Sequence, residues 1–527
     1  MTPRVLALLL GLVGLAASAF VAVVVPATAH ETSDAPRERL PRFPEPTDHA
    51  AYFTRPFADG PAVTRTCLTC HPDAAREVKG TAHWTWQGGH GVRSDTGEAV
   101  AFGKRNVLNN FCIAVPSNWP RCTSCHAGYG WEDASFDPAQ AADDRVDCLV
   151  CHDGSGQYAK DPQGAGRPDR GVDLLAAARS VGRSSRATCG TCHFKGGGGD
   201  AVKHGDLDET MRFPPDRVDV HMGRHGLRCA DCHRAEGHRI RGRLMPTDAD
   251  GTRVRCEDCH AAAPHGDERI DLHLRAVACT TCHVPTFAAE TPTKMWWDWS
   301  KAGRDGDPEA VAHAIVADTV AGGAEGRLVP PAVLALFRRV GTDPDVSTHY
   351  DKKKGLFLLA REQVPEYRWY DGTSSRHLPG ERFDGDGPVP LNPPHGRVGD
   401  PAARIVPFKV HRGVQPFDAE LRHLLVPHTF GPGGYWSAFD WERALVDGAK
   451  ASGIAYSGHS TWRSTEMVWP QNHMVRPKTE ALRCTDCHGD GGRLDWAALG
   501  YPGDPAVRGG RVAAGLLDVA TRPGATR

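Results

Sequence analysis

The chain has 527 residues, and its 62 basic and 64 acidic side chains leave a net charge of −2. Nothing in this balance indicates nucleic-acid binding, which normally needs a basic domain. Glycine (58 residues) and proline (40) are abundant, and both residues punctuate turns. We therefore expect a mainly α fold with extensive loops, short helices and little β structure.

The first 29 residues are predicted to be an export signal. Arg4 supplies the charged start, residues 5–25 are almost wholly apolar, and residues 27–29 (Ala-Thr-Ala) offer a cleavage site before His30. Because the apolar run is long enough to span a bilayer, an uncleaved N-terminal membrane anchor is the alternative. Either form predicts a periplasmic or other extracytoplasmic location.

A five-residue unit, Cys-x-x-Cys-His, occurs eight times; we call these units motifs 1 to 8 in chain order. Two thiols at this spacing can each bond one vinyl group of a haem, and the histidine that follows can bind the iron from the proximal side. The cysteine pairs are Cys67/Cys70, Cys122/Cys125, Cys148/Cys151, Cys189/Cys192, Cys229/Cys232, Cys256/Cys259, Cys279/Cys282 and Cys484/Cys487. The proximal histidines are His71, His126, His152, His193, His233, His260, His283 and His488.

Cys-x-x-Cys pairs also build zinc sites and redox disulfides, but neither needs histidine as the next residue. The repeated histidine therefore predicts eight covalently attached c-type haems. Of the 17 cysteines, 16 lie in the motifs, and Cys112 is left over.

The motif spacing divides the chain. Residues 30–66 are expected to form an extended, proline-rich leader, and residues 67–290 a heptahaem domain whose core is made of porphyrin faces. Residues 291–500 form a haem-poor wrapping region that brings motif 8 to the array. Residues 501–527 are expected to be a peripheral tail.

Within the haem-poor region, residues 308–320, 331–340 and 436–451 are predicted helices, since proline or glycine marks their ends. Residues 355–360 are a candidate strand. The aromatic cluster at residues 295–299 (Met-Trp-Trp-Asp-Trp) is expected to pack against haem edges rather than to contact substrate.

Nineteen of the 27 histidines are not proximal, enough to supply most sixth iron ligands. Two candidates, His238 and His265, each lie five residues after a proximal histidine, too close to reach the far side of the same iron, so each is expected to serve a neighbouring haem. Surface histidine is the alternative for each candidate, and His204 and His225 are reserves. The distal candidates are His83, His221, His238, His265, His273, His411 and His473.

Four stretches carry a family resemblance: residues 109–112 (Asn-Asn-Phe-Cys), 117–126, 192–206 and 469–475. With the motif count and order, the chain from about residue 60 to residue 500 resembles the octahaem tetrathionate reductase family of periplasmic multihaem c-type cytochromes. The resemblance implies a multihaem cytochrome c fold with a haem-packed core. It also implies seven bis-histidine haems that carry electrons and one reactive haem, on motif 2, with lysine as its distal ligand.

The lysine must come from outside the motifs, because no Cys-x-x-Cys-Lys unit is present. Lys203 follows a four-glycine run, and Lys195 is the competitor; the family pattern favours Lys203. A ligating lysine must be neutral, which burial promotes by lowering its pKa. A surface lysine is the alternative for either residue.

The leftover Cys112 is predicted to be a thiol beside the distal face of the motif 2 haem, where it positions a sulfur substrate or exchanges with its S–S bond. A small buried hydrophobic role is the alternative. Asn109 is expected to donate a hydrogen bond to substrate. Cys112, Lys203, Asn109 and His126 are thus the candidate catalytic residues.

Members of such a family reduce tetrathionate, nitrite and hydroxylamine, so the chain is expected to be an oxidoreductase with a small oxyanion substrate and a periplasmic or membrane-bound electron donor. Two alternatives remain. One is a non-catalytic electron carrier with eight six-coordinate haems. The other is a hydroxylamine-oxidising octahaem enzyme, a class that cross-links a tyrosine to its active haem; Tyr501 is the nearest tyrosine after motif 8.

Overall fold

The computed structural model describes residues 46–93, 96–242 and 253–517. The predicted export signal and the first part of the leader lie outside these ranges, as do residues 518–527. Within the described ranges, no helix is both long enough and apolar enough to cross a bilayer.

The motif-bearing region is built from short helices joined by loops, as its composition predicts. Several motifs are themselves a single helical turn, because the histidine N–H donates to the carbonyl of the first cysteine: the N···O distance is 2.8 Å in motif 5 and 2.9 Å in motif 6. The α-helices are α2 (Gly60–Leu68), α3 (Ala74–Lys79), α4 (Ala82–Thr85), α5 (Trp119–Cys122), α6 (Leu149–His152), α7 (Leu174–Arg179), α8 (Arg186–His193), α9 (Cys229–Cys232), α10 (Glu268–Leu272) and α11 (Cys279–His283).

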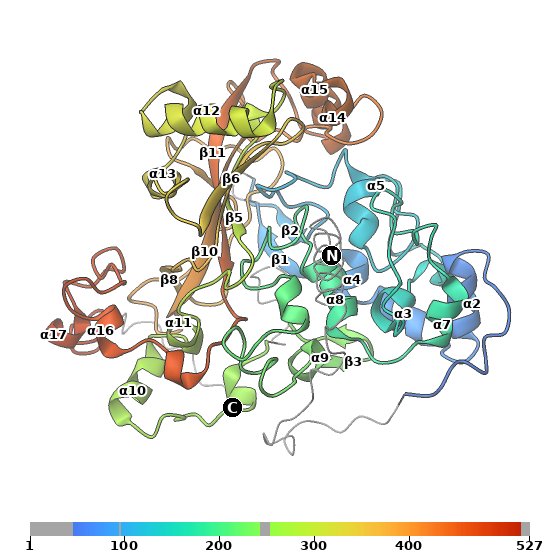
Figure 1. Cartoon of the computed structure of the whole chain (residues 1–527), viewed down its shortest axis with the longest axis horizontal. Coiled ribbons are helices and arrows are strands. Elements are labelled where there is room, and N and C mark those ends of the chain that lie inside the picture. The colour runs from blue at the N-terminus through green and yellow to red at the C-terminus, as the bar shows by residue number, and fades with distance from the viewer. Residues whose placement is uncertain (1–45, 94–95, 243–252, 518–527) are drawn as a thin grey trace, which may run out of the picture.

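Tighter 3-10 turns and two small hairpins complete this region. The 3-10 turns are Thr123–Cys125, Asp143–Arg145, Glu209–Arg212, Cys256–Asp258 and His273–Arg275. The hairpins pair β1 (Gly89–Val92) with β2 (Ala99–Phe102) and β3 (Ala235–Glu236) with β4 (Arg239–Ile240). The motif-bearing elements run in an arc beside the sheet, from α2 through α8 and α9 to α16 (Cys484–Cys487) (Figure 1).

The haem-poor region contains a seven-stranded mixed sheet, so the expectation of little β structure is wrong. The order is β6-β7-β5-β10-β11-β9, and β8 also pairs with β10. Its strands are β5 (Thr293–Asp298), β6 (Val346–Asp351), β7 (Gly355–Ala360), β8 (Glu366–Tyr370), β9 (Val389–Pro390), β10 (Arg404–Asp418) and β11 (Ser460–Pro470).

Strand β10 explains why the sheet was missed. Residues 408–418 of this strand pair antiparallel with β11, residues 404–407 pair antiparallel with β8, and nearly all of its 15 residues are buried. A strand covered on both faces has no alternation of polar and apolar residues. The prolines at positions 407 and 416 further argue against a central strand when only the sequence is read.

The three helices predicted in this region are present, and the one predicted over 331–340 ends at Phe337. The helices are α12 (Pro308–Val320), α13 (Pro331–Phe337), α14 (Tyr435–Ala438), α15 (Trp441–Ser452), α16 (Cys484–Cys487) and α17 (Pro505–Arg508), with 3-10 turns at Trp299–Lys301, Ala324–Gly326 and Lys478–Glu480. Helix α12 and strand β7 have the predicted bounds. The helix predicted over 436–451 is split at Phe439, whose φ of 52° ends α14.

The tryptophans of residues 295–299 form part of the sheet core. Trp296 is fully buried among Ile315 and Leu358, and the rings of Trp297 and Trp299 stack with centroids 4.9 Å apart. Their described neighbours are thus side chains of the sheet and of residues 108–114.

Part of the predicted peripheral tail is packed. Tyr501 is buried beside Trp369 and Trp496. The guanidinium of Arg511 donates to the carbonyls of Asp400 and Arg275.

Candidate functional site

Seven of the eight motif histidines face a second histidine at a nearly constant distance. Two imidazoles that bind one metal at about 2 Å each, with about 1 Å more from each nitrogen to its ring centre, have centroids about 6 Å apart. The observed centroid distances are 6.0–6.4 Å for the pairs His49–His71, His238–His152, His83–His193, His473–His233, His221–His260, His265–His283 and His273–His488.

The orientation of these rings also suits metal binding. In several of them Nδ1 is hydrogen-bonded to the protein, which leaves Nε2 to face the space between the paired rings. Nδ1 of His152 lies 2.8 Å from the carbonyl of Gly182, and that of His233 lies 2.9 Å from the carbonyl of Arg241. The same nitrogen contacts a carboxylate in His238, His265, His473 and His488. The donor set at these seven motifs therefore fits bis-histidine haem.

Six of the seven predicted distal histidines occupy such positions, and His411 does not. His411 is fully buried on β10, its Nδ1 lies 3.0 Å from Oδ1 of Asn110, and its ring contacts Phe111. No motif histidine stands opposite it in the described pairs. The histidine opposite motif 1 is His49, in the leader, which the sequence did not single out because it precedes every motif.

The thiols of different motifs lie close together and link the motifs into one network. In four pairs the two thiols lie close enough to interact directly: Cys67–Cys148, Cys125–Cys192, Cys189–Cys229 and Cys256–Cys279. Four more pairs are near enough for their charges to interact: Cys151–Cys189, Cys232–Cys259, Cys282–Cys487 and Cys282–Cys484. The resulting order is 1-3-4-5-6-7-8, with motif 2 attached to motif 4. Motif 4 is therefore a junction of three neighbours.

Not all of the motif cysteines lie in the interior that a haem-packed core would give them. Cys70 of motif 1 is exposed, and its sulfur lies 3.8 Å from the hydroxyl of the adjacent Thr69. This motif joins the network through its first cysteine, Cys67, rather than through Cys70. The other exposed motif cysteines are Cys232, Cys256, Cys259 and Cys484. The thioether bonds of these five residues to haem stay a prediction.

Motif 2 differs from the others because no histidine ring faces His126 among the described residues. His126 is fully buried inside the rings of Trp84, Trp86 and Trp131. Burial lowers its pKa to about 3, so the ring is neutral at physiological pH. Its Nε2 lies 2.7 Å from the carbonyl of Trp84, while Nδ1 is buried without a described hydrogen-bond partner. An unpartnered ring nitrogen fits a metal ligand, although here it is Nδ1 rather than Nε2.

The glycine run that precedes Lys203 allows this lysine to lie close to motif 2. Residues 197–199 all have positive φ, the conformation that glycine adopts without strain. A Cβ on Gly197 would lie 3.3 Å from the Phe111 ring and 3.4 Å from Cβ of Lys203, so the run allows close packing. Burial and the positive charges of Lys104 and Arg376 lower the pKa of Lys203 to about 8, and Cys125 of motif 2 acts in the opposite direction.

Cys112 lies in a loop that packs against the glycine run. A Cβ on Gly198 would lie 3.4 Å from its sulfur, and its charge affects Cys122 of motif 2. Asn109 fixes this loop, since its Oδ1 accepts the N–H groups of residues 111, 112 and 113 at 2.9–3.2 Å. Ile113 has a φ of 78°, an uncommon and strained value for a β-branched residue. Because these bonds occupy the side-chain oxygen of Asn109, its amide nitrogen is the group that can donate a hydrogen bond to another molecule.

The surroundings of Cys112 are strongly cationic. Burial raises the pKa of the thiol, and four positive side chains oppose that shift: Lys294, Arg121, Lys104 and Lys354. Lys294 is held with Nζ 3.6 Å from the ring centre of Phe357, and burial lowers its pKa to about 8. A region with this charge attracts small anions.

Three comparisons bear on these features. Residues 294–491 match the family described as bacterial cytochrome c. An uncharacterised protein of Archaeoglobus fulgidus is 25% identical over 224 residues, which cover 33% of this chain and 74% of that protein. The crystal structure of octahaem cytochrome c from Shewanella oneidensis is 42% identical with a TM-score of 0.74, and the match covers 87% of this chain and 98% of that chain.

The chain belongs to the octahaem cytochrome c family. This finding confirms the family resemblance and the multihaem cytochrome fold expected from the motifs, and it agrees with c-type haem as the group that the histidine pairs accommodate.

Two residues that the sequence offered as alternatives lie away from motif 2: Lys195 as the lysine ligand, and Tyr501 as a tyrosine cross-linked to haem. Lys195 is on the surface, with its side chain 53% exposed and Nζ 3.0 Å from Glu209. Tyr501 packs on Trp496, which stacks on His488 of motif 8. Since His488 already faces His273, Tyr501 does not adjoin a motif that lacks a second histidine.

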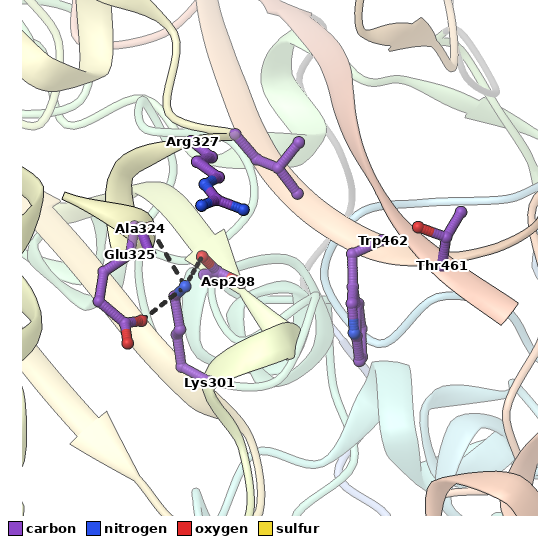
Figure 2. Close-up of a pocket in the computed structure, with 8 residues that line it drawn as sticks. Asp298, Lys301, Ala324, Glu325, Arg327, Thr461 and Trp462 are labelled. Atoms are coloured by element: carbon purple, nitrogen blue, oxygen red, sulfur yellow. Dashed lines mark hydrogen bonds and ion pairs between the residues drawn. The ribbon is translucent and has the colours of Figure 1, made fainter. Parts of the chain in front are cut away.

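A separate cavity of about 280 Å³ lies in the sheet region, between residues 298–301, residues 324–328 and β11 (Figure 2). Its lysine, Lys301, is already paired with Glu325 at 2.8 Å and Asp298 at 3.7 Å. The cavity contains no motif residue, so it is not a candidate for the haem chemistry.

Proposed function

We propose that this protein is an exported octahaem reductase that adds several electrons to tetrathionate, nitrite or hydroxylamine at motif 2. The observation that carries the proposal is the missing partner of His126. Seven motif histidines face a second imidazole, whereas His126 has Lys203, Cys112 and a cluster of cations near its motif.

The motif cysteines would hold the eight haems by thioether bonds, and the histidine pairs would complete seven irons. Covalent haem supplies a redox-active iron and, where one axial position can open, a place for a substrate atom. His126 would bind the remaining iron on one side and neutral Lys203 on the other. The amine of Lys203 would carry a positive charge when protonated, and that charge would favour an anionic substrate beside it.

The thiol network supports delivery of more than one electron. Motif 2 adjoins motif 4, and motif 4 adjoins the motifs on both sides of the array. Cleavage of an S–S bond takes two electrons, and reduction of nitrite to ammonium takes more. Neighbouring redox centres can supply either number without release of a half-reduced product.

Cys112 and Asn109 would orient the substrate. The Asn109 amide nitrogen donates a hydrogen bond to a substrate oxygen, since its oxygen is already used by the loop. Cys112 contacts the sulfur chain of tetrathionate from the same loop. The proposal includes export by cleavage before His30 and a periplasmic or membrane-bound electron donor.

The test compares a substitution of Lys203 with the same substitution of Lys195. Lys203→Met is expected to change the electron paramagnetic resonance signal of one haem and to alter turnover of tetrathionate, nitrite and hydroxylamine sharply. Lys195→Met, at an exposed ion pair of little energetic weight, is the matched control and is expected to leave both unchanged.

Cys112→Ser separates substrate classes. Haem content is expected to stay intact, while tetrathionate reduction falls more than nitrite reduction if the thiol acts on sulfur. Wild-type turnover in both Lys203→Met and Cys112→Ser would contradict a reaction site at motif 2 and favour the electron-carrier alternative.

A further inference from the structure

Arg376 is a buried cation that the functions described so far do not use. Its exposed fraction is 3%. All three guanidinium nitrogens are buried without a hydrogen-bond partner in the part of the chain that the structure describes. Burial lowers its pKa to about 9, and Tyr370 is the one titratable group that acts in the opposite direction.

Two other arginines with little exposure are paired with carboxylates. Arg412 pairs with Glu366 at 2.7 Å and Glu466 at 3.1 Å, and Arg476 pairs with Glu362 at 3.0 Å. A buried charge with no partner is strongly unfavourable, since desolvation is not offset. The contrast indicates that the partner of Arg376 is a group other than a protein side chain.

The backbone holds Arg376 firmly in place. Its neighbours in the segment between β8 and β9 pair with the chain around β9: the N–H of Ser375 lies 3.2 Å from the carbonyl of Pro393, and that of His377 lies 3.0 Å from the carbonyl of Leu391. Because β9 joins β11, and Trp469 of β11 lies under Nζ of Lys203 at 4.7 Å, this segment approaches the motif 2 site from the sheet side.

The charges around Lys203 point to the same missing anion. Lys104 and Arg376 both act on Lys203 as positive charges, and no carboxylate is among the described groups that shift it. Three cations thus lie near motif 2, and no carboxylate is among the described groups that shift the pKa of Lys203 or of Arg376.

We propose that Arg376 binds an anionic oxygen group beside Lys203, with its planar fork of N–H donors directed at two oxygens. A guanidinium recognises a carboxylate or an oxyanion in this bidentate way. Two sources share that chemistry: a propionate of the motif 2 haem, and the oxygens of the substrate. The second source rests on the proposed function, whereas the first needs only haem at motif 2.

The test uses the haem-loaded full-length protein with Arg376→Met, and Arg327→Met, at an exposed side chain, as the matched control. Haem content and intact mass establish loading. Two quantities are then measured: the midpoint potential of the haem at motif 2 by potentiometry with electron paramagnetic resonance, and the dissociation constant for nitrite from its spectral change.

A propionate partner predicts that the midpoint potential of one haem falls in Arg376→Met, because a positive charge that favours the reduced state is lost, while nitrite affinity stays the same. A substrate partner predicts an unchanged potential without nitrite and a nitrite dissociation constant raised about tenfold or more, the scale of one charge-assisted interaction. Wild-type values of both quantities in loaded Arg376→Met would overturn the inference.

If Arg376→Met does not load haem, a crystal structure of the wild-type holoprotein, with and without nitrite, decides the question. A guanidinium nitrogen within about 3.2 Å of a haem carboxylate or of nitrite supports the inference, and a guanidinium bonded to water or protein alone overturns it. This inference can hold even if the proposed function fails. If the protein reduces none of the substrates but Arg376→Met still lowers the midpoint potential of one haem, the partner of Arg376 is a propionate.

Discussion

The region of the motifs and the region of the sheet obtain their cores in different ways. In the first, the longest described helix has nine residues, and the buried apolar clusters are small, such as the one around Val63 and Leu149. In the second, β10 alone buries most of 15 residues, and two large clusters meet at Trp462. Helices as short as those of the motif region are marginal without tertiary support. We therefore expect the first region to depend on its haems for folding, whereas the second has a core made of its own side chains.

Removal of haem tests this contrast most strongly. We expect protein made without haem attachment to lose the structure of residues 46–283, because their histidine pairs and thiols then have no bonding partner, while residues 293–470 keep their sheet. Limited proteolysis with mass spectrometry reads the cleavage sites. Cleavage spread evenly over both regions would contradict the distinction, and the haem-loaded protein is the control.

Trp296→Ala addresses the sheet region by itself. Truncation of this fully buried ring is expected to lower the free energy of unfolding by about 3–5 kcal/mol, with no change in the haem spectra. Denaturant titration followed by tryptophan fluorescence measures the loss. Val320→Ala, at a 39% exposed position at the end of α12, should change stability little. A comparable loss of stability in this variant would contradict burial as the cause of the effect at Trp296.

His83→Met addresses the junction in the motif region. His83 faces His193 of motif 4, so the substitution is expected to shift the potential of that haem and slow delivery of electrons to motif 2 for every substrate. Stopped-flow reoxidation measures the rate. His49→Met alters motif 1 at one end of the thiol network and should slow reoxidation less. Equal effects from both variants would argue against a junction at motif 4.

Gly198→Ala is the mildest change, made where the two regions meet. Its φ is 102°, and the added methyl lies 3.4 Å from the Cys112 sulfur. We expect a loss of stability of about 1–2 kcal/mol from the unfavourable backbone conformation, together with lower tetrathionate turnover. Gly97→Ala, with a φ of 73° and no neighbour within 4 Å, shares the backbone strain. Equal turnover in the two variants would show that the contact with Cys112 has no functional weight.

The sequence by itself determined the chemistry that is local in the chain. Each Cys-x-x-Cys-His motif places its two thiols and its histidine on one turn, so its cofactor class follows from five residues. Helix α12 and strand β7 were predicted because short patterns of glycine, proline and apolar residues define them. The family resemblance was predicted from the motif count and order and from four short stretches.

Only the tertiary structure decided what depends on distant residues. The sequence does not show which of His49 and His411 faces a motif histidine. In the structure His49 faces His71, whereas His411 contacts Asn110. The sheet was hidden because β10 is covered on both faces and carries no alternating pattern. Arg376 reads in the sequence as an ordinary surface arginine, yet it is buried, and its charge acts on Lys203, which lies more than 150 residues away along the chain. Long-range contacts of this kind leave no local signal, since packing energy acts between residues that the fold alone brings together.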